Sequence, residues 1–311
     1  MGKIFRHSFF SVLALACLPS CIGRNVHTPP VPPVPPDIVA SQIEVIEQSI
    51  PKTAIRARIR IETYTVALEG RSGMQINTFD AATIEQIEKD LRRFEIEFEK
   101  LNLCIEIQSV EYIDPIQNAI VTEHDLRSYE HITRATDPND LYIYYIMSHG
   151  CMPRIAGYSV FPWNKGNSIF ILGRIANEYT LTHEMGHYLG LMHTFDIFGD
   201  KVDDTVDFGF EVKRDDYFSS HLGDPAFDPN ATNIMTYTPA FEQSFTDGQL
   251  ERARFYLENY RARQTGELRA DYDLNLLLRT ADTDRFNRIN EIIRSLNPDV
   301  YIPSRQITVE P

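Results

Sequence analysis

The hydrophobic pattern along the chain predicts a β-sheet. Residues 55–62 alternate strictly, with isoleucine or alanine at odd positions and arginine or glutamate at even ones, which is the period of a half-exposed strand. Residues 104–113 alternate similarly, and a turn-like segment occupies 69–73. The runs 141–147 and 168–172 are denser in apolar residues, and the first suits a strand buried on both faces. We therefore expect three or four strands in this part of the chain.

Other stretches show the helical period. Residues 81–101 carry large apolar side chains at helical spacing, so we predict a helix that backs the sheet, with Asp80 as its N-cap. A second helix is expected over about 176–190. A third is expected over about 247–263, with Thr246 as its N-cap. Strands interleaved with helices indicate an α/β (or α+β) fold.

The N-terminal residues are typical of an exported protein. Residues 1–20 combine two basic residues with a short apolar run, which indicates a secretory signal peptide. They end at a sequence similar to a bacterial lipoprotein box, so Cys21 is the expected lipidation site. The alternative is an ordinary secretory leader with an incidental cysteine. Residues 21–49 then form the lipidated N-terminus and linker, whose Pro-rich stretch 28–37 predicts an extended polyproline spacer.

Charge narrows the choice of partners. The chain has 311 residues with 30 Lys+Arg and 44 Asp+Glu, and removing a leader with two basic residues changes the net charge from −14 to −16. Such a surface repels nucleic acid and anionic membrane, which leaves the lipid as the membrane contact. Outside the leader and Cys21, only Cys104 and Cys151 remain. They either form one disulfide or stay as two free buried thiols.

Candidate chemistry is concentrated in residues 183–193. His183 and His187, four apart on a helix, share one face and can bind one metal ion together. Glu184 is placed within reach of a water bound to that metal. Gly190 can end the helix, because glycine adopts a positive φ at little energetic cost. The chain can then reverse and bring His193 to the metal as a third ligand. Three imidazoles and a water form an open tetrahedral zinc site, and chance gives roughly one such pattern in ten thousand chains of this length.

An acidic segment follows the histidines. Its carboxylates of interest are Asp200, Asp203, Asp204 and Asp207. Clustered carboxylates are the ligands that calcium prefers, so one interpretation is a structural Ca²⁺ site. A solvated acidic loop is the equally open alternative.

The histidine motif resembles that of the metzincin zinc endopeptidases. Those proteins also have a tight turn with a methionine beneath the zinc, and Asn233–Tyr237, with Met235 at its centre, looks like that Met-turn. The pappalysin (cytophagalysin-like) family is the most similar in detail. Further matching segments are 157–162, 180–182, 193–195, 199–205 and 245–249.

The resemblance implies a domain organisation. Residues 50–265 would form a metzincin-like catalytic domain. It would have a twisted mixed sheet, a backing helix and an active-site helix, over a smaller irregular or helical lower lobe. Residues 266–311 lie beyond the resemblance and are expected to be a helical extension of unknown role, with one or two amphipathic helices over 266–298.

Roles for individual residues follow from this chemistry. Zn²⁺ would polarise the scissile carbonyl and lower the pKa of water from 15.7 towards about 7. Glu184 would act as general base and then general acid. Tyr237 would ligate the resting metal or hydrogen-bond the oxyanion, unless it is only a packed core tyrosine. Met235 would be a structural floor.

The expected function is zinc-dependent hydrolysis of peptide bonds in extracellular proteins. The protein would be a monomer that is exported and membrane-anchored through its lipid, or else secreted. Two alternatives stay open. One is a lipid-anchored binding or adhesion protein that keeps a peptidase fold without turnover, and the other is a zinc hydrolase with a non-peptide substrate.

Overall fold

A computed structural model describes residues 51–70, 73–113, 137–147, 156–173, 176–196, 198–206, 228–237 and 243–296. The predictions for the signal peptide, Cys21, the linker, Cys151 and Asp207 fall outside these ranges. None of the helices within them is both long and apolar enough to cross a membrane.

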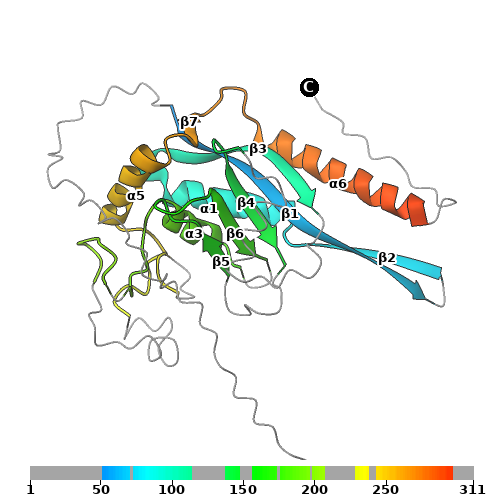
Figure 1. Cartoon of the computed structure of the whole chain (residues 1–311), viewed down its shortest axis with the longest axis horizontal. Helices are drawn as coiled ribbons and strands as arrows, with labels where there is room; N and C mark the ends of the chain where they lie inside the picture. Colours follow the sequence, from blue (N-terminus) through cyan, green and yellow to red (C-terminus); the bar gives the residue numbers. More distant parts are fainter. Residues whose placement is uncertain are drawn as a thin grey trace, which may run out of the picture. The chain divides into compact units, whose positions relative to one another are not determined.

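Seven strands form one mixed sheet (Figure 1). Its main path is β2-β1-β4-β6-β5, while β3 and β7 also pair with β1. The strands are β1 (Thr53–Gly70), β2 (Gly73–Asp80), β3 (Leu103–Ile113), β4 (Leu141–Ile146), β5 (Gly157–Ser159), β6 (Ser168–Leu172) and β7 (Thr265–Glu267). β1, β3, β4 and β6 run parallel, whereas β2, β5 and β7 are antiparallel to their partners. This twisted mixed sheet with helices confirms the predicted α/β fold class.

The helices are α1 (Ile84–Glu97), the 3₁₀ turn η1 (Glu99–Leu101), α3 (Thr180–Tyr188), α5 (Asp247–Tyr260) and α6 (Leu274–Leu296). α1 backs the sheet as predicted. Its buried residues Ile87, Leu91 and Phe94 join the core that the odd-numbered positions of residues 55–61 form on β1. All six residues of β4 are buried, as its dense apolar run predicted.

Two boundaries differ from the sequence prediction. The strand predicted at 55–62 extends to Gly70, and the antiparallel strand β2 begins at Gly73, with Gly70 paired to Gly73, so the segment 69–73 includes the ends of two strands. Asp80 is not the N-cap of α1. It is the last residue of β2 and accepts a hydrogen bond from Thr63 Oγ1 at 2.8 Å. The cap is Thr83, whose Oγ1 accepts from Gln86 N at 3.1 Å.

α3 and α5 are shorter than expected. α3 begins at Thr180 rather than Ala176, because the Asn177 side chain accepts from Tyr179 N at 2.9 Å and forms a turn before the helix. α5 begins after the predicted cap, Thr246, in a full capping box with Gln249. It ends at Tyr260, and the chain then enters β7.

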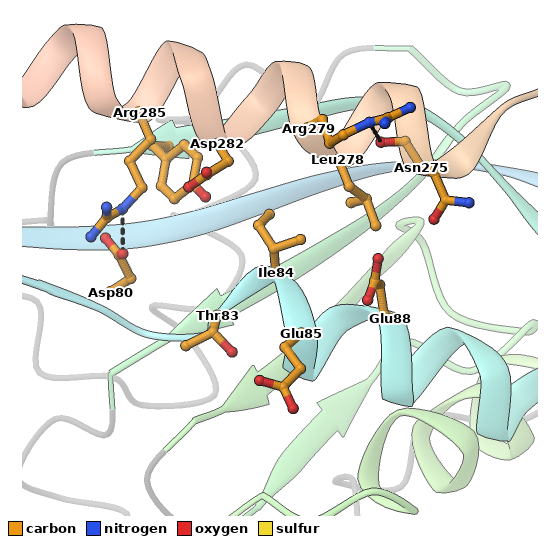
Figure 2. Close-up of a pocket in the computed structure, with 11 residues that line it drawn as sticks. Asp80, Thr83, Ile84, Glu85, Glu88, Asn275, Leu278, Arg279, Asp282 and Arg285 are labelled. Carbon is orange, nitrogen blue, oxygen red and sulfur yellow. Dashed lines mark hydrogen bonds and ion pairs between the residues drawn. The ribbon is translucent and has the colours of Figure 1, made fainter. Parts of the chain in front are cut away.

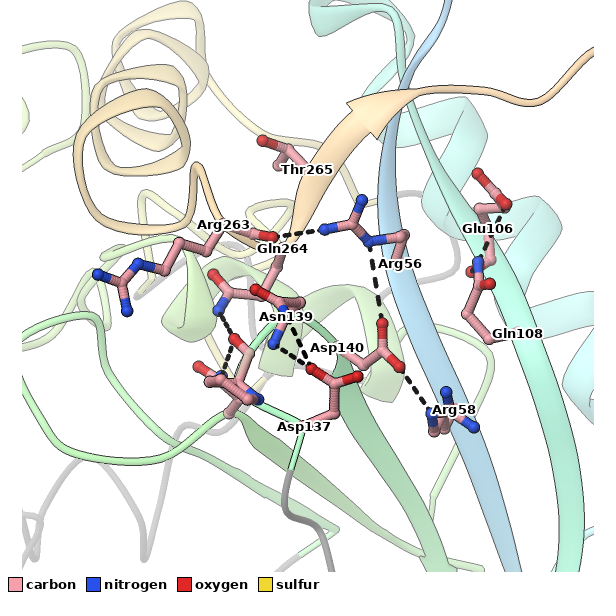
Figure 3. Close-up of polar contacts among 12 residues, drawn as sticks. Arg56, Arg58, Glu106, Gln108, Asp137, Asn139, Asp140, Arg263, Gln264 and Thr265 are labelled. Carbon is pink, nitrogen blue, oxygen red and sulfur yellow. Dashed lines mark hydrogen bonds and ion pairs between the residues drawn. The ribbon is translucent and has the colours of Figure 1, made fainter.

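The C-terminal elements pack onto the sheet. β7 pairs with the first residues of β1, and residues 274–296 form the single helix α6, which contacts β3. Polar contacts reinforce the β7 end (Figure 3). There Arg56 donates to the Arg263 carbonyl at 2.6 Å, and Arg58 pairs with Asp140 at 2.6 Å.

Candidate metal centre

The three motif histidines converge at the end of α3. His183 and His187 lie one turn apart on the helix, and Gly190, with φ +84°, reverses the chain so that His193 returns. The Nε2 atom of His193 lies 3.3 Å from that of His183 and 3.0 Å from that of His187. Within the described residues, these three side chains are the one group of three or more that could hold a metal ion.

Backbone carbonyls fix how two of the imidazoles are protonated. His183 Nδ1 lies 2.6 Å from the Ile234 carbonyl oxygen, and His187 Nδ1 lies 2.8 Å from that of Leu191. Because a carbonyl can only accept, each Nδ1 carries the proton and each Nε2 presents a lone pair. His193 Nε2 can donate a proton to only one of these two lone pairs. The lone pairs of these converging nitrogen atoms therefore suit a cation bound between them.

Burial also keeps these imidazoles neutral. Burial lowers the pKa of His183 to about 4. Burial, with a smaller effect from the charge of His183, lowers the pKa of His187 to about 3. Metal binding needs deprotonated ligand atoms. Three nitrogen atoms at about 2.0–2.1 Å from a tetrahedral ion lie roughly 3.3 Å apart; the two distances from His193 Nε2 are close to this, and the ligand atoms of all three histidines lie within 4.8 Å of one another. The chemistry and the grouping of these three residues thus fit a metal ion.

Glu184 is a buried acid beside this cluster. Only 5% of its surface is exposed, and its Oε2 atom has no hydrogen-bond partner among the described residues. Burial raises the pKa of Glu184 to about 8. A buried carboxyl oxygen without a partner is uncommon and calls for a functional explanation. The side chain packs against Gly157, the first residue of β5, where a Cβ atom would lie 2.6 Å from Glu184 Cγ.

Met235 lies directly beneath α3. It is fully buried, and a Cβ atom on Gly186 would lie 2.5 Å from its sulfur. The turn also contacts both ends of the histidine motif. The Ile234 carbonyl accepts from His183, and the Met235 carbonyl accepts from Thr194 N at 3.1 Å. The turn therefore supports the ligands from below.

Tyr237 flanks the histidines. Its ring centroid lies 4.7 Å from that of His193 and 5.7 Å from that of His183, and it also contacts Phe195 at 5.0 Å. The residue is 41% exposed. The tyrosine is therefore not a fully buried core residue, and its ring lies against two of the three histidines.

The acidic loop shows no metal cluster in its described part. Asp200 accepts from Val202 N and Thr205 Oγ1, and Asp204 accepts from Thr246 Oγ1 and Gly248 N. Asp203 is exposed. The carboxylates of Asp200 and Asp204 thus fold the loop and cap α5, and the calcium interpretation gains no support.

The sequence did not indicate most of the residues that pack against the histidine motif and fix its position. A Cβ atom on Gly190 would overlap the ring of Tyr256 on α5, so this glycine is needed for space as well as for its φ. Arg252 Nε donates to the Gly190 carbonyl at 2.8 Å. In the sequence, Gly157 was noticed only as part of a family-like segment, and nothing pointed to the buried Arg252 of α5.

Two further features lie away from the histidines. Cys104 is a buried free thiol. A cavity of about 650 Å³ is lined by residues of α1 and α6 (Figure 2), with Ile84 and Leu278 pointing toward each other from the two helices and the Asp80–Arg285 ion pair at one end. Neither feature includes a residue of the predicted site.

Two sequence comparisons find metalloproteases that are similar to part of this chain. Residues 172–258 match the peptidase family model described as Pregnancy-associated plasma protein-A. An extracellular metalloprotease of Colletotrichum graminicola is 41% identical over 96 residues, which cover 27% of this chain and 32% of that protein. The chain thus spans about a third of that relative's length. Both sequence matches support a metalloprotease, and the family match includes the histidine motif and Met235.

A solved structure is also similar. Metalloproteinase-II from Bacteroides fragilis aligns with 14% sequence identity and a TM-score of 0.36, over 67% of this chain and 55% of that one. A score this low has no bearing on function.

Proposed function

We propose that the protein is a zinc endopeptidase of the pappalysin type, with His183, His187 and His193 as metal ligands. The observation that carries this proposal is the convergence of three Nε2 atoms beside a buried glutamate, in a segment that matches metalloproteases. Three imidazoles with a water are a zinc donor set. When bound, zinc would supply Lewis-acid polarisation of the scissile carbonyl and a more acidic water.

Glu184 moves the proton in this proposal. A cation bound by the neighbouring histidines would favour the charged form of Glu184 over the protonated form that burial favours, and the carboxylate then takes a proton from the attacking water as the water oxygen bonds to the carbonyl carbon. It then gives that proton to the amine nitrogen as the C–N bond breaks, so that one water is consumed and a carboxyl and an amine end are formed. Tyr237 would hydrogen-bond the developing oxyanion from the exposed side of the histidines.

The sheet edge beside Glu184 favours an extended polypeptide as substrate. β5 ends the described strand order and is antiparallel to β6. The Leu172 N–H donates to the Ala156 carbonyl and Val160 N–H donates to that of Ser168, so the backbone groups of Gly157 and Ser159 point outwards. An extended chain added to this edge would lie next to Glu184.

The location of the enzyme remains a proposal from the sequence. Export through residues 1–20 and anchoring through a lipid on Cys21 would place the site outside the cell, with residues 21–49 as spacer. The extracellular description of the fungal relative supports export. Residues 50–265 would be the catalytic domain of a monomer that binds no nucleic acid, with 266–311 as its helical extension.

The test is proteolysis by the purified full chain loaded with zinc. We expect cleavage of denatured protein, and Glu184→Gln should lower kcat by about 10²–10⁴-fold while zinc stays bound. The matched control is Glu178→Gln, which changes a half-exposed glutamate just before α3 that pairs with Arg93, and it should cleave normally. A zinc-loaded wild type that cleaves no protein or peptide would refute the proposal and favour a binding role.

A further inference from the structure

Arg261 is a buried arginine that joins three segments around the metal centre. It follows the last residue of α5, and only 3% of its surface is exposed. Its Nε donates to the Tyr188 carbonyl at 3.2 Å, at the end of α3. Its Nη2 donates to the Val160 carbonyl at 2.7 Å, just after β5. The guanidinium also lies 3.7 Å from the centroid of the Tyr188 ring.

The third segment is the end of the β5–β6 loop. Arg261 Nη1 donates to the Gly166 carbonyl at 3.2 Å and to Asn167 Oδ1 at 2.9 Å. All four acceptors are neutral oxygens, so the guanidinium serves as a rigid fork between segments and not as half of an ion pair. The carbonyls at a helix C-terminus lack intrahelical partners and favour a cation, which explains the contact with Tyr188.

The segments that Arg261 joins are those that contact the reactive side chains. The loop residue Phe161 lies 4.9 Å from His187 between ring centroids. Gly157, at the start of β5, packs against Glu184. Movement of the loop relative to α3 would therefore displace both the metal ligand and the acid.

We infer that Arg261 is a positioning residue for the proposed hydrolysis, on which this inference rests. It sets the distance between the β5–β6 loop and the end of α3, and thereby the placement of Glu184 and His187. Lysine cannot replace it, because an ammonium group lacks the planar fork that reaches several acceptors at once. A 1 Å misplacement of a catalytic group costs roughly 10²-fold in rate.

The chain contains a spectroscopic probe of this loop. Trp163 is its single tryptophan, and it stacks on Phe161 with centroids 4.7 Å apart. It also meets Tyr256 of α5 edge-on at 5.7 Å. Fluorescence of the folded protein therefore reports on the loop, whether or not the protein cleaves a substrate.

The experiment compares Arg261→Lys with Arg58→Lys in the full chain. Arg58 is the control, because its 2.6 Å ion pair joins β1 to Asp140, the residue just before β4 (Figure 3), and includes no residue of the site. Both variants should stay folded by circular dichroism. For Arg261→Lys we expect a kcat lower by about 10–100-fold with KM little changed, together with greater acrylamide quenching of Trp163. Arg58→Lys should alter neither.

Asn167→Ala removes one acceptor and serves as a milder second variant if Arg261→Lys does not fold. It should shift kcat and quenching in the same direction. Wild-type kcat and quenching in a folded Arg261→Lys, or in Asn167→Ala if that is the folded variant, would overturn the inference. If the wild type cleaves nothing, the proposed function fails, but increased quenching in the variant would still show that Arg261 holds the loop.

Discussion

Gly157 lies so close to Glu184 that a Cβ atom on the glycine would be 2.6 Å from both Cγ and Oε1 of the glutamate. The edge strand and the buried acid are therefore in direct contact. The flexible Glu184 side chain can move away from an added methyl group, whereas main-chain atoms in the same place could not. Substitution at Gly157 should thus move the acid and leave the fold in place.

The first prediction is that Gly157→Ala loses most activity while remaining folded and metal-bound. A displaced Glu184 can no longer hold the attacking water, and we expect kcat to fall by about 10²-fold. The control is Gly266→Ala in the short strand β7, where a Cβ atom would lie 3.6 Å from Arg56 Nη1, an ordinary contact. Peptidase assays on both variants test this, and equal activities would contradict it.

The second prediction concerns Tyr237, whose ring lies 4.7 Å from that of His193. Tyr237→Phe keeps the ring and removes the hydroxyl, so zinc affinity should change little. If the hydroxyl donates to the oxyanion, kcat should fall by about 10²-fold with KM nearly unchanged. Tyr260→Phe, on a comparably exposed tyrosine of α5, is the control. A wild-type kcat in Tyr237→Phe would show that the residue only packs.

The sequence predicted residues whose role depends on local spacing. His183 and His187 are set by the helical repeat, and Gly190 by the need for positive φ, so the grouping with His193 could be inferred from eleven consecutive residues. Alternation likewise identified residues 55–62 as part of a strand. Such features depend on backbone geometry within one element.

Long-range supports could not be inferred in this way. Arg261 is separated from Val160 by 101 positions, and nothing in the sequence near either residue indicates the other. Thr83 rather than Asp80 caps α1 because Asp80 belongs to β2, a strand that the pattern did not predict. These contacts arise from tertiary packing, which overrides local preference.

A third prediction concerns the pH dependence of stability. Asp90 of α1 is buried, and its carboxylate accepts from Tyr145 Oη at 2.8 Å and Gln86 Nε2 at 2.7 Å. Burial raises the pKa of Asp90 to about 6, against opposing effects of these two hydrogen bonds. Between about pH 4 and 6 the folded state therefore binds more protons than the unfolded state, and stability falls as pH rises.

Asp90→Asn should remove this fall. As the pH rises across that window, the free energy of unfolding of the variant should increase by about 1–3 kcal/mol relative to that of the wild type. Urea denaturation of metal-free protein at several pH values measures this difference. The introduced amide would keep an acceptor oxygen, and the Gln86 amide can rotate to accept from the new NH₂ group. Asp271→Asn, at an exposed position, controls for the loss of one negative charge. Parallel pH profiles for wild type and Asp90→Asn would contradict the prediction.

The last prediction concerns Gln249, which takes part in the N-terminal cap of α5 and also supports the turn that contains Met235. The two roles can be tested separately. The Gln249 amide is buried. It accepts from Thr246 N at 3.0 Å and exchanges two hydrogen bonds with the Asn233 amide. Asn233 Oδ1 in turn accepts from Met235 N at 2.8 Å. Gln249 thus links the start of α5 to the turn that presents the Ile234 carbonyl to His183.

Gln249→Leu would leave buried donors unpaired and should cost about 1–3 kcal/mol of stability. Because the turn also orients His183, zinc affinity should fall as well. Thr246→Ala loses the helix cap but keeps the amide pair, so it should cost about 0.5–2 kcal/mol with zinc affinity unchanged. Urea denaturation and zinc titration against a competing chelator measure both effects. If both variants bound zinc as tightly as wild type, the turn would hold His183 without help from Gln249.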